Sequence, residues 1–211
     1  LESKGDSMPR QIPRDAVAKS VIAGITRAQH DYEALSGGDW AWMAAEYWIT
    51  TYVAKEVGDI PGAKLVTVES SAKQAVEDAG GSRRGRPPSA ARLGGRFDIL
   101  LWYANGFPRA VIEIKSQTSI SPILEDVDRI QALLKSRSDS STLSFGVIGY
   151  YFSAKPRRSM KGQDKVATQI GSLIDEVRAR SYSGVKVIPH VSDVAVERSG
   201  DAWGACAILL C

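Results

Sequence analysis

Apolar positions near the start of the chain recur at steps of three and four residues, which is the spacing of one face of an α-helix. This pattern predicts a helix over residues 14–35, which Ser36-Gly37-Gly38 would end. Asp39 is a suitable N-cap for a second helix over residues 40–57, a segment rich in Trp and Tyr. The chain is therefore expected to begin with two consecutive helices.

A β-hairpin is predicted in the middle of the chain. Residues 96–103 and 109–115 are rich in β-branched and other apolar side chains, and the Asn105-Gly106 pair between them is a strong hairpin signal. The preceding segment, residues 80–95, is rich in Gly and holds two adjacent Pro, so regular structure is not expected there.

Helices and strands alternate along the rest of the chain. The predicted elements are a strand over 64–69, a short helix over 71–79, a helix over 122–136 opened by Pro122, a strand over 143–152, a helix over 164–180, and strand-like runs over 185–196 and 202–210. Residues 143–152 are mostly apolar, as expected of a strand buried on both faces. This order predicts an α/β fold, with a central mixed β-sheet flanked by helices.

The composition is that of one compact domain. With 211 residues, 44% hydrophobic and 24% charged, the chain can bury a sizeable core and lacks the bias of disordered or fibrous proteins. We expect a single domain over 14–211, with residues 1–13 as a tail of the kind that an expression vector adds. The apolar runs are far shorter than the roughly 20 residues that a membrane span needs.

Cysteine usage and charge say little about partners. Cys206 and Cys211 are an odd number of residues apart, so on one strand they would point to opposite faces, and no disulfide is expected. Two reduced thiols and a polar start without a signal peptide predict a cytoplasmic protein. The net charge of +3 is too mild to demand nucleic acid, so evidence for that partner has to come from where the charges lie.

The predicted hairpin carries the strongest chemical signal. Because strand side chains alternate between faces, Glu113 and Lys115 share one face of the second strand. Pairing across the Asn105-Gly106 turn places Asp98 opposite Glu113. Two neighbouring carboxylates repel each other unless a cation compensates them, and Mg²⁺ is commonly held by two carboxylates with water and substrate phosphate. A lysine beside them can hold the attacking water or remove its proton.

The alternative is a charged pair on the solvated face of a hairpin. An E-x-K triplet alone carries little information, since Glu2-Ser3-Lys4 has the same pattern. The flanking residues of both predicted strands are apolar on both faces, however, which is not typical of a surface hairpin. Because buried carboxylates without a partner are costly, this context favours the metal site.

The order of these features resembles that of the PD-(D/E)xK nuclease superfamily, which has a restriction-endonuclease-like core. The features are Asp98, a hairpin, Glu113-x-Lys115, a helix and a buried strand. The core's order of helix, three-strand meander, crossover helix and strand matches residues 39–152, with the helix over 71–79 as an insertion. The matching segments cover roughly half of the chain. One departure is Phe97, where the superfamily commonly has Pro.

The resemblance implies a role for each residue of the motif. Asp98, Glu113 and the carbonyl of Ile114 would bind Mg²⁺, for which Mn²⁺ would substitute. Lys115 would position the attacking water. Glu46, on the first core helix, would complete the metal shell directly or through water.

Glu46 also stands out in its own helix. Its neighbours three and four positions away are Trp42, Met43, Ile49 and Thr50, which places it on a mainly apolar face. A carboxylate facing the core needs a cation or a hydrogen-bond donor. The alternative is that Glu46 emerges at the edge of the apolar stripe.

Further candidates follow the hairpin. Gln117 continues the face of Glu113 and Lys115, and the superfamily often has a polar residue there, which makes Gln117 a candidate catalytic residue. The predicted crossover helix offers Glu125, Asp128, Arg129 and Gln131, most of which would be solvated surface residues.

Two basic segments are candidate contacts for nucleic acid, although each could be only a solubilising loop. One precedes the hairpin without any acidic residue and contains Arg83, Arg84, Arg86, Arg92 and Arg96. The other follows the buried strand and contains Lys155, Arg157, Arg158, Lys161 and Lys165. Arginines beside a phosphodiester site are well suited to phosphate contacts.

The predicted function is that of a Mg²⁺-dependent DNA endonuclease, which the resemblance would place in bacterial or phage restriction or defence. The alternative is a non-catalytic nucleic-acid-binding or assembly module that kept the fold. Cleavage of RNA, junction resolution and exonucleolytic trimming stay open, as does a homodimer or larger complex. His30 and His190 are isolated in sequence, and no G-x-x-x-x-G-K-[ST] loop is present, so neither a Ser-His-Asp hydrolase nor an ATP motor is predicted.

Overall fold

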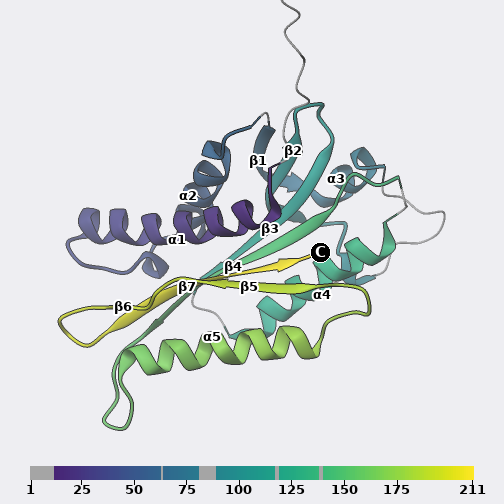
Figure 1. The fold of residues 1–211 in the computed structure, drawn as a ribbon. Helices are drawn as coiled ribbons and strands as arrows, with labels where there is room; N and C mark the ends of the chain where they lie inside the picture. The colour runs from purple at the N-terminus through teal and green to yellow at the C-terminus, as the bar shows by residue number, and fades with distance from the viewer. Residues whose placement is uncertain (1–11, 63, 81–88, 117–118, 138–139) are drawn as a thin grey trace, which may run out of the picture.

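A mixed seven-stranded sheet forms the centre of this computed structural model, with helices on both of its faces (Figure 1). The structure describes residues 12–62, 64–80, 89–116, 119–137 and 140–211. The helices are α1 (Arg14–Ser36), α2 (Glu46–Asp59), α3 (Ala72–Asp78), α4 (Ile120–Ser136) and α5 (Gly162–Ala179), with short 3₁₀ turns η1 (Ala41–Met43) and η2 (Ser89–Ala91). The strands are β1 (Lys64–Ser71), β2 (Arg96–Tyr103), β3 (Pro108–Ser116), β4 (Phe145–Ala154), β5 (Val187–Val191), β6 (Ala195–Val196) and β7 (Ala202–Leu210).

The strand order is β1-β2-β3-β4-β7-β5, and β6 pairs with β7. Strands β1, β2 and β3 form an antiparallel meander, while β4 runs parallel to β3 after the crossover through α4. Strand β7 is antiparallel to β4. The α/β fold with a central mixed sheet is therefore confirmed, and the parallel pair brings the ends of β3 and β4 to the same edge of the sheet.

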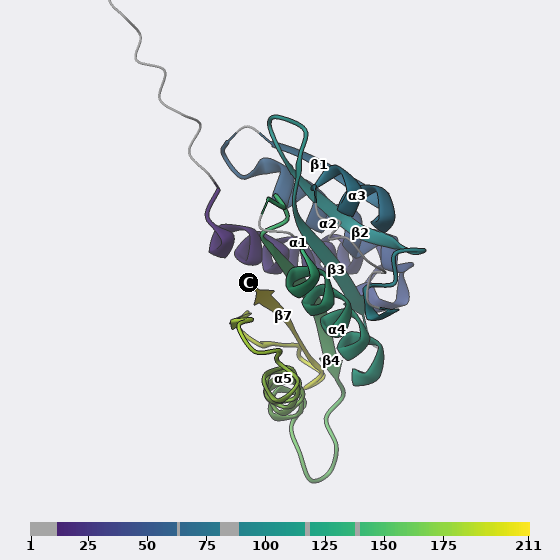
Figure 2. The ribbon, with the colours of Figure 1, turned by 90° about the vertical axis from the view of Figure 1, so that its right-hand side faces the viewer.

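Two apolar layers hold the helices on the sheet. Helices α1 and α2 cover one face, where Ile112 and Ile114 of β3 point. Helices α3, α4 and α5 cover the other face, where Val111 of β3 packs, and Figure 2 shows α4 in front of β3 and β4. Strand β4 is buried at every position, as the continuous apolar run predicts for a strand covered on both sides.

The predicted helix over 40–57 is wrong in its first part. Residues 41–43 form the 3₁₀ turn η1, and α2 begins only at Glu46. Tertiary hydrogen bonds hold this segment outside the helix, since the indole of Trp40 donates to Glu197 (2.8 Å) and the N–H of Ala41 donates to Gln29 (2.8 Å). Partners so distant in sequence cannot be read from local periodicity.

Other boundaries shift by a few residues. Helix α4 starts two residues before Pro122, which lies in its first turn. A 3₁₀ turn at Ser89–Ala91 interrupts the segment expected to be irregular. Cys206 is buried in β7 and Cys211 follows that strand, and both thiols are free as predicted. Among the described residues, no helix combines the length and the apolar character needed to cross a membrane.

Helix α1 crosses α2 closely at Gly24. A Cβ atom at this position would lie 2.5 Å from Cα of Val53, a backbone atom that cannot turn away. We expect Gly24→Ala to lower the free energy of unfolding by about 1–3 kcal/mol, as overpacking of a core does. Gly171→Ala, in α5 with no atom within 4 Å of the added carbon, is the matched control and should be stabilising by about 0.5–1 kcal/mol. Urea unfolding of both variants checks this, and equal shifts would contradict the close crossing.

Candidate active site

The hairpin of β2 and β3 brings the predicted residues together. Ile99 pairs with Ile112 and Leu100 with Val111, the predicted register, so Asp98 of β2 lies beside Glu113 of β3. A register shift near the turn leaves this end of the hairpin unchanged. The alternation of the strand puts Glu113 on the face that α4 covers.

Hydrogen bonds from backbone N–H groups hold the carboxylates of Asp98 and Glu113 in place. The N–H of Ile114 donates to Oδ2 of Asp98 (2.7 Å), and the N–H of Asp98 donates to Oε2 of Glu113 (3.4 Å). The Asp98 side chain is 18% exposed, whereas that of Glu113 is only 3% exposed. The site is therefore open on the side of Asp98 and closed beneath Glu113.

The ammonium of Lys115 lies among three carboxylates from three elements. Its Nζ is 3.5 Å from Oε1 of Glu46 (α2), 3.8 Å from Oδ2 of Asp98 (β2) and 3.4 Å from Oδ2 of Asp126 (α4). It also donates to the carbonyl of Ile114 (3.0 Å). Lys115 thus links both faces of the sheet at the end of β3.

Arg129 of α4 pairs with Glu113 beneath the site. Its Nη1 is 2.7 Å from Oε1 of Glu113, and the two side chains are 5% and 3% exposed. The same nitrogen donates to the carbonyl of Arg96 (2.9 Å), and the guanidinium lies 4.4 Å from the ring centre of Phe97. These contacts fix Arg129, so the pair holds Glu113 in one orientation.

The surroundings of Glu113 disfavour its ionised form. Burial raises the pKa of Glu113 to about 8, with the neighbouring charges of Asp98 and Asp126 acting in the same direction and Arg129 and Lys115 opposing them. A carboxyl so disfavoured in its ionised form gains strongly from an additional cation.

Lys115 and Glu46 respond to the same surroundings. Burial opposes the charge on Lys115, but the nearby carboxylates, Asp98 and Asp126 foremost, outweigh it and raise the pKa of the ammonium. Burial also raises the pKa of Glu46, against the attraction of Lys115. Lys115 therefore stays protonated and acts as a donor of hydrogen bonds.

These residues open onto a cleft of about 260 Å³. It is lined by Arg92, Gly95, Arg96, Asp98, Glu113, Lys115, Pro122, Glu125, Asp126 and Arg129. Its acidic residues come from β2, β3 and α4, while its arginines come from three places, Arg92 before β2, Arg96 at the start of β2 and Arg129 in α4. A phosphate group could thus meet cationic side chains while its ester bond lies near the carboxylates.

A divalent cation fits the donor set of this cleft. Among the described residues, no three acidic, histidine or cysteine side chains already form a metal cage. Two carboxylates and a carbonyl, from Asp98, Glu113 and Ile114, would still suit Mg²⁺, which keeps several waters and is seldom caged by protein alone. The buried Oδ2 of Asp126 lies 3.4 Å from Nζ of Lys115 but has no hydrogen-bond partner among the described residues, so its capacity to accept a hydrogen bond is unused.

Glu46 is placed differently from its prediction. It does not face the core from the middle of a helix, because α2 starts at this residue, and its side chain is 44% exposed. Its carboxylate still reaches Lys115 from the first turn of α2. The alternative, in which Glu46 emerges at the edge of the apolar stripe, describes its position better.

The first basic segment is described only in part, since Arg83, Arg84 and Arg86 lie outside the described residues. Gln117, the candidate after the hairpin, also lies outside them. Arg92 and Arg96 line the cleft. Arg92 pairs with Asp126 and also with Glu125 (3.5 Å), while Arg96 is 3.9 Å from Glu69.

Residues 155–161 of the second basic segment form an exposed turn beyond β4, in which Arg157 and Met160 form an isolated bridge, whereas Lys165 lies in α5. In Figure 2 this turn is the green loop below the end of β4. Lys155, Arg157 and Arg158 are all exposed. Because β4 is parallel to β3, the turn lies beyond the edge of the sheet at which Lys115 is placed.

Helix α4 contributes more to the site than the sequence suggested. Of its four candidates, Arg129 is in the site and Glu125 lines the cleft, whereas Asp128 pairs with Arg180 (3.1 Å) and Gln131 accepts from the N–H of Tyr182. Asp126 was missed. A signal was present, because Asp126 lies three residues after Ile123 and one before Val127, within the stripe that faces the sheet.

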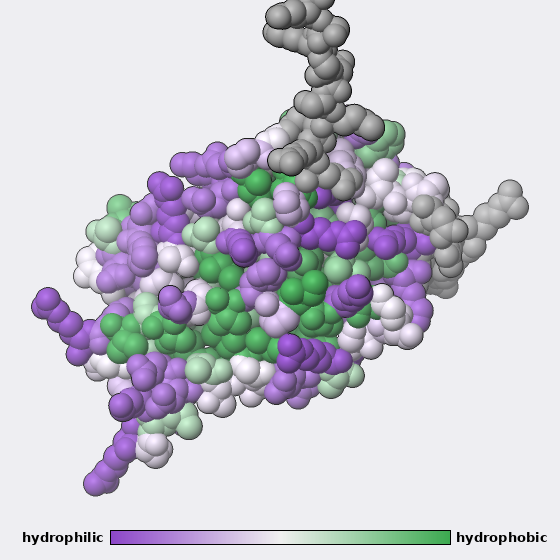
Figure 3. Space-filling model, viewed as in Figure 1, coloured by the Kyte–Doolittle hydropathy of each residue, from purple (hydrophilic) through white to green (hydrophobic). Residues whose placement is uncertain are grey.

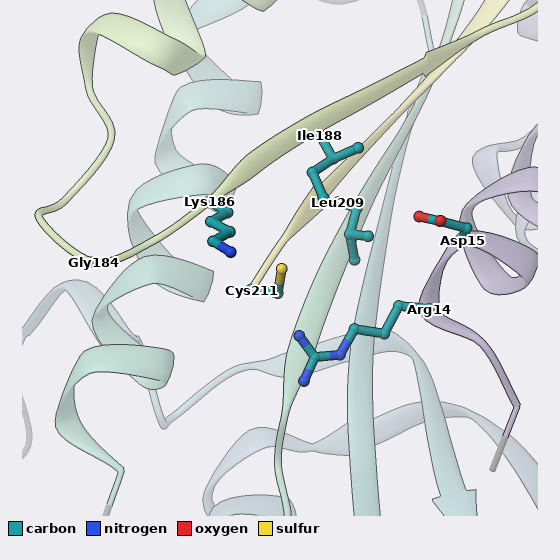
Figure 4. Close-up of a pocket in the computed structure, with 7 residues that line it drawn as sticks. All are labelled: Arg14, Asp15, Gly184, Lys186, Ile188, Leu209 and Cys211. Carbon is teal, nitrogen blue, oxygen red and sulfur yellow. The ribbon is translucent and has the colours of Figure 1, made fainter.

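A second cavity, of about 520 Å³, lies between the start of α1 and the strands β5 and β7 (Figure 4). Arg14 and Lys186 reach it from opposite sides, near Cys211. It shares no lining residue with the acidic cleft. Hydrophobic residues gather across the middle of one face of the molecule (Figure 3). Ile188 and Val191 of the edge strand β5 are exposed.

Comparisons with known proteins identify no relative. No protein-family model, curated protein or solved structure matches the chain. Function is therefore inferred from the residues and geometry of this chain alone, and the resemblance to the PD-(D/E)xK superfamily stays a prediction.

The buried pair of Arg129 and Glu113 generates a stability prediction. Above pH 8, where Glu113 is ionised because its pKa is about 8, Arg129→Met leaves the carboxylate buried without its partner, so we expect a loss of about 3–5 kcal/mol in the free energy of unfolding. The double variant Arg129→Met/Glu113→Gln should recover most of this loss, because neither charge is then buried. Urea unfolding measures both, with Arg178→Met in an exposed ion pair as the control that should change little. A double variant as unstable as Arg129→Met would contradict the pairing.

Proposed function

We propose that this protein is a metal-dependent nuclease, with Mg²⁺ as its cofactor and DNA as its preferred substrate. The observation that carries the proposal is the meeting of Asp98 and Glu113 beside the ammonium of Lys115, in a cleft lined by arginines. Hydrolysis of a phosphodiester needs a cation at the phosphate and a positioned water. This set of side chains is suited to both tasks.

In the proposed mechanism, Asp98, Glu113 and the carbonyl of Ile114 would hold the cation. When bound, Mg²⁺ supplies charge compensation at the phosphate and acidifies a coordinated water. Lys115 acts as a donor that orients the water or a phosphate oxygen, because its acidic neighbours keep it protonated. It is not the group that removes the proton, which is a narrower role than the motif alone suggests.

The order of elements supports a restriction-endonuclease-like core as part of the proposal. Helix α2, the meander β1-β2-β3, the crossover helix α4 and strand β4 follow one another as in that core, with α3 as an insertion. Asp98 and Glu113-x-Lys115 lie on the second and third strands of the meander, where the superfamily has its motif.

The arginines favour a polyanionic substrate. Arg92 and Arg96 border the cleft, and the exposed turn with Lys155, Arg157 and Arg158 extends beyond the same edge of the sheet. Separated cationic groups of this kind suit several phosphates along one strand or duplex better than one small phosphate ester.

One observation favours a second candidate, a nucleic-acid-binding module without catalysis. Lys115 and Arg129 already compensate much of the carboxylate charge without a metal. In such a module, the cluster would serve only to hold α4 on the hairpin. Cleavage assays separate the two candidates.

We expect Glu113→Gln to abolish cleavage, with a rate at least about 100-fold below that of the parent, because a carboxylate ligand and its charge are lost. The assay follows supercoiled plasmid, linear duplex, single-stranded DNA and RNA with Mg²⁺, Mn²⁺ or EDTA. Asp98→Asn should behave in the same way, and Asp175→Asn, on the exposed side of α5, is the matched control that should cut as the parent does.

Thermal unfolding shows whether each variant stays folded. A folded Glu113→Gln variant that cuts as fast as the parent would overturn the site. A parent that binds DNA in a salt-sensitive way but never cuts, whichever metal is added, would favour the binding module.

The turn after β4 should contribute to DNA binding through phosphate contacts. We expect Arg157→Ala/Arg158→Ala to weaken duplex binding and to reduce the slope of log K against log salt by up to about 2, since each lost phosphate contact removes about 0.9. Lys19→Ala/Lys55→Ala, which removes the same charge from exposed positions on α1 and α2, is the matched control. Fluorescence anisotropy over a salt series measures the slopes, and equal slopes for the two double variants would exclude a specific role of the turn.

A further inference from the structure

Asp126 is a buried carboxylate that the proposed mechanism leaves without a role. It is 4% exposed and projects from α4 into the cleft. Its two oxygens face different cations, since Oδ1 pairs with Arg92 and Oδ2 lies 3.4 Å from Nζ of Lys115. A single side chain thus joins the arginine at the rim of the cleft to the lysine at its base.

The two contacts are unequal. Arg92 makes a hydrogen-bonded ion pair with Oδ1. In contrast, Oδ2 has no hydrogen-bond partner among the described residues, although it is buried. Oδ2 therefore attracts the ammonium of Lys115 by charge, without a hydrogen bond. A buried charge acts strongly on a neighbouring cation.

Arg92 is positioned to leave this pair. Its side chain is 43% exposed, while that of Asp126 is 6% exposed. Its backbone is held in the left-handed region (φ 43°), and its carbonyl accepts from the N–H of Gly95 (3.0 Å) and from Arg129 (3.5 Å). The backbone is thus fixed at the rim while the guanidinium can turn toward a ligand in the cleft.

We propose that Asp126 is a positioning residue shared between Lys115 and Arg92, and that a backbone phosphate of the substrate takes Arg92 away from it. This inference rests on the proposed nuclease function. A phosphate offers the planar guanidinium the same two-pronged acceptor as a carboxylate does. Once Arg92 has turned to the phosphate, Asp126 interacts with Lys115 alone and keeps the ammonium in place for hydrolysis.

The proposal predicts opposite effects of Asp126 on binding and on cleavage. Without its charge, Arg92 keeps only its longer contact with the exposed Glu125 (3.5 Å) before the substrate arrives, so binding tightens. Lys115 loses one of the carboxylates that position it, so cleavage slows. A purely structural role would weaken both, and a general effect of charge would tighten binding without slowing cleavage.

The test compares Asp126→Asn with Asp128→Asn. Both remove one negative charge from α4, but Asp128 pairs with Arg180 outside the cleft. Binding of a duplex is measured in EDTA by fluorescence anisotropy, and cleavage under single-turnover conditions with Mg²⁺. We expect Asp126→Asn to lower Kd by about two- to fivefold, the range of one exposed ion pair, and to slow cleavage by about 10- to 100-fold.

Asp128→Asn should change neither quantity by more than about twofold, as is usual for an exposed charge. Adding Arg92→Ala to Asp126→Asn should abolish the gain in binding, which attributes that gain to Arg92. Circular dichroism and thermal unfolding show that each variant is folded.

Three outcomes would overturn the proposal. Equal changes in Kd for the two Asn variants would show that Arg92 is not restrained by Asp126. Tighter binding with an unchanged cleavage rate would show that Asp126 does not position Lys115. A parent protein that neither binds nor cuts the duplex would overturn the proposed function itself, which the parent measurement reveals before any variant is compared.

Discussion

Compensation of buried charge at the end of β3 is the constraint on which the rest of the site depends. Burial at the sheet raises the pKa of Glu113 to about 8, and the nearby charges of Asp98 and Asp126 act in the same direction. Buried carboxylates are tolerated only with cationic partners. Arg129 supplies one from α4, and Lys115 supplies another from the same strand. The crossover helix is thereby joined to the hairpin by charge as well as by apolar packing.

This arrangement separates the roles of the two cations. Arg129 is almost completely buried and held by several contacts, so it orients Glu113 and cannot reach a substrate. Lys115 is 19% exposed and faces the cleft, so it can donate to a ligand there. The acidic surroundings keep Lys115 charged, which favours a role in orientation over one in proton removal. A divalent cation would stabilise the ionised form of Glu113, which burial disfavours.

Helix α4 shows how one element can serve both the core and the site. Its apolar stripe, with Ile123, Val127 and Ile130, packs on the sheet and fixes the axis of the helix. Asp126 and Arg129 lie along the same side, so the packing that orients the helix also places both charges. A shift of α4 would therefore disturb the core and the carboxylate cluster together. The spacing marks Asp126 within the stripe that faces the sheet, but only the packed structure shows which polar residues of α4 meet the hairpin.

The sequence by itself determined the α/β class, the order of elements, the hairpin register and the shared face of Glu113 and Lys115, because these follow from local periodicity and turn chemistry. It did not determine the start of α2 at Glu46 or the convergence of Asp126, Arg129 and Arg92 on the hairpin. Those features depend on contacts between residues far apart in the chain, such as the bond of Trp40 to Glu197 and the pair of Arg129 and Glu113. Only the tertiary structure decides which charges share one buried site, because the cost of burying each depends on the neighbours that the fold brings to it.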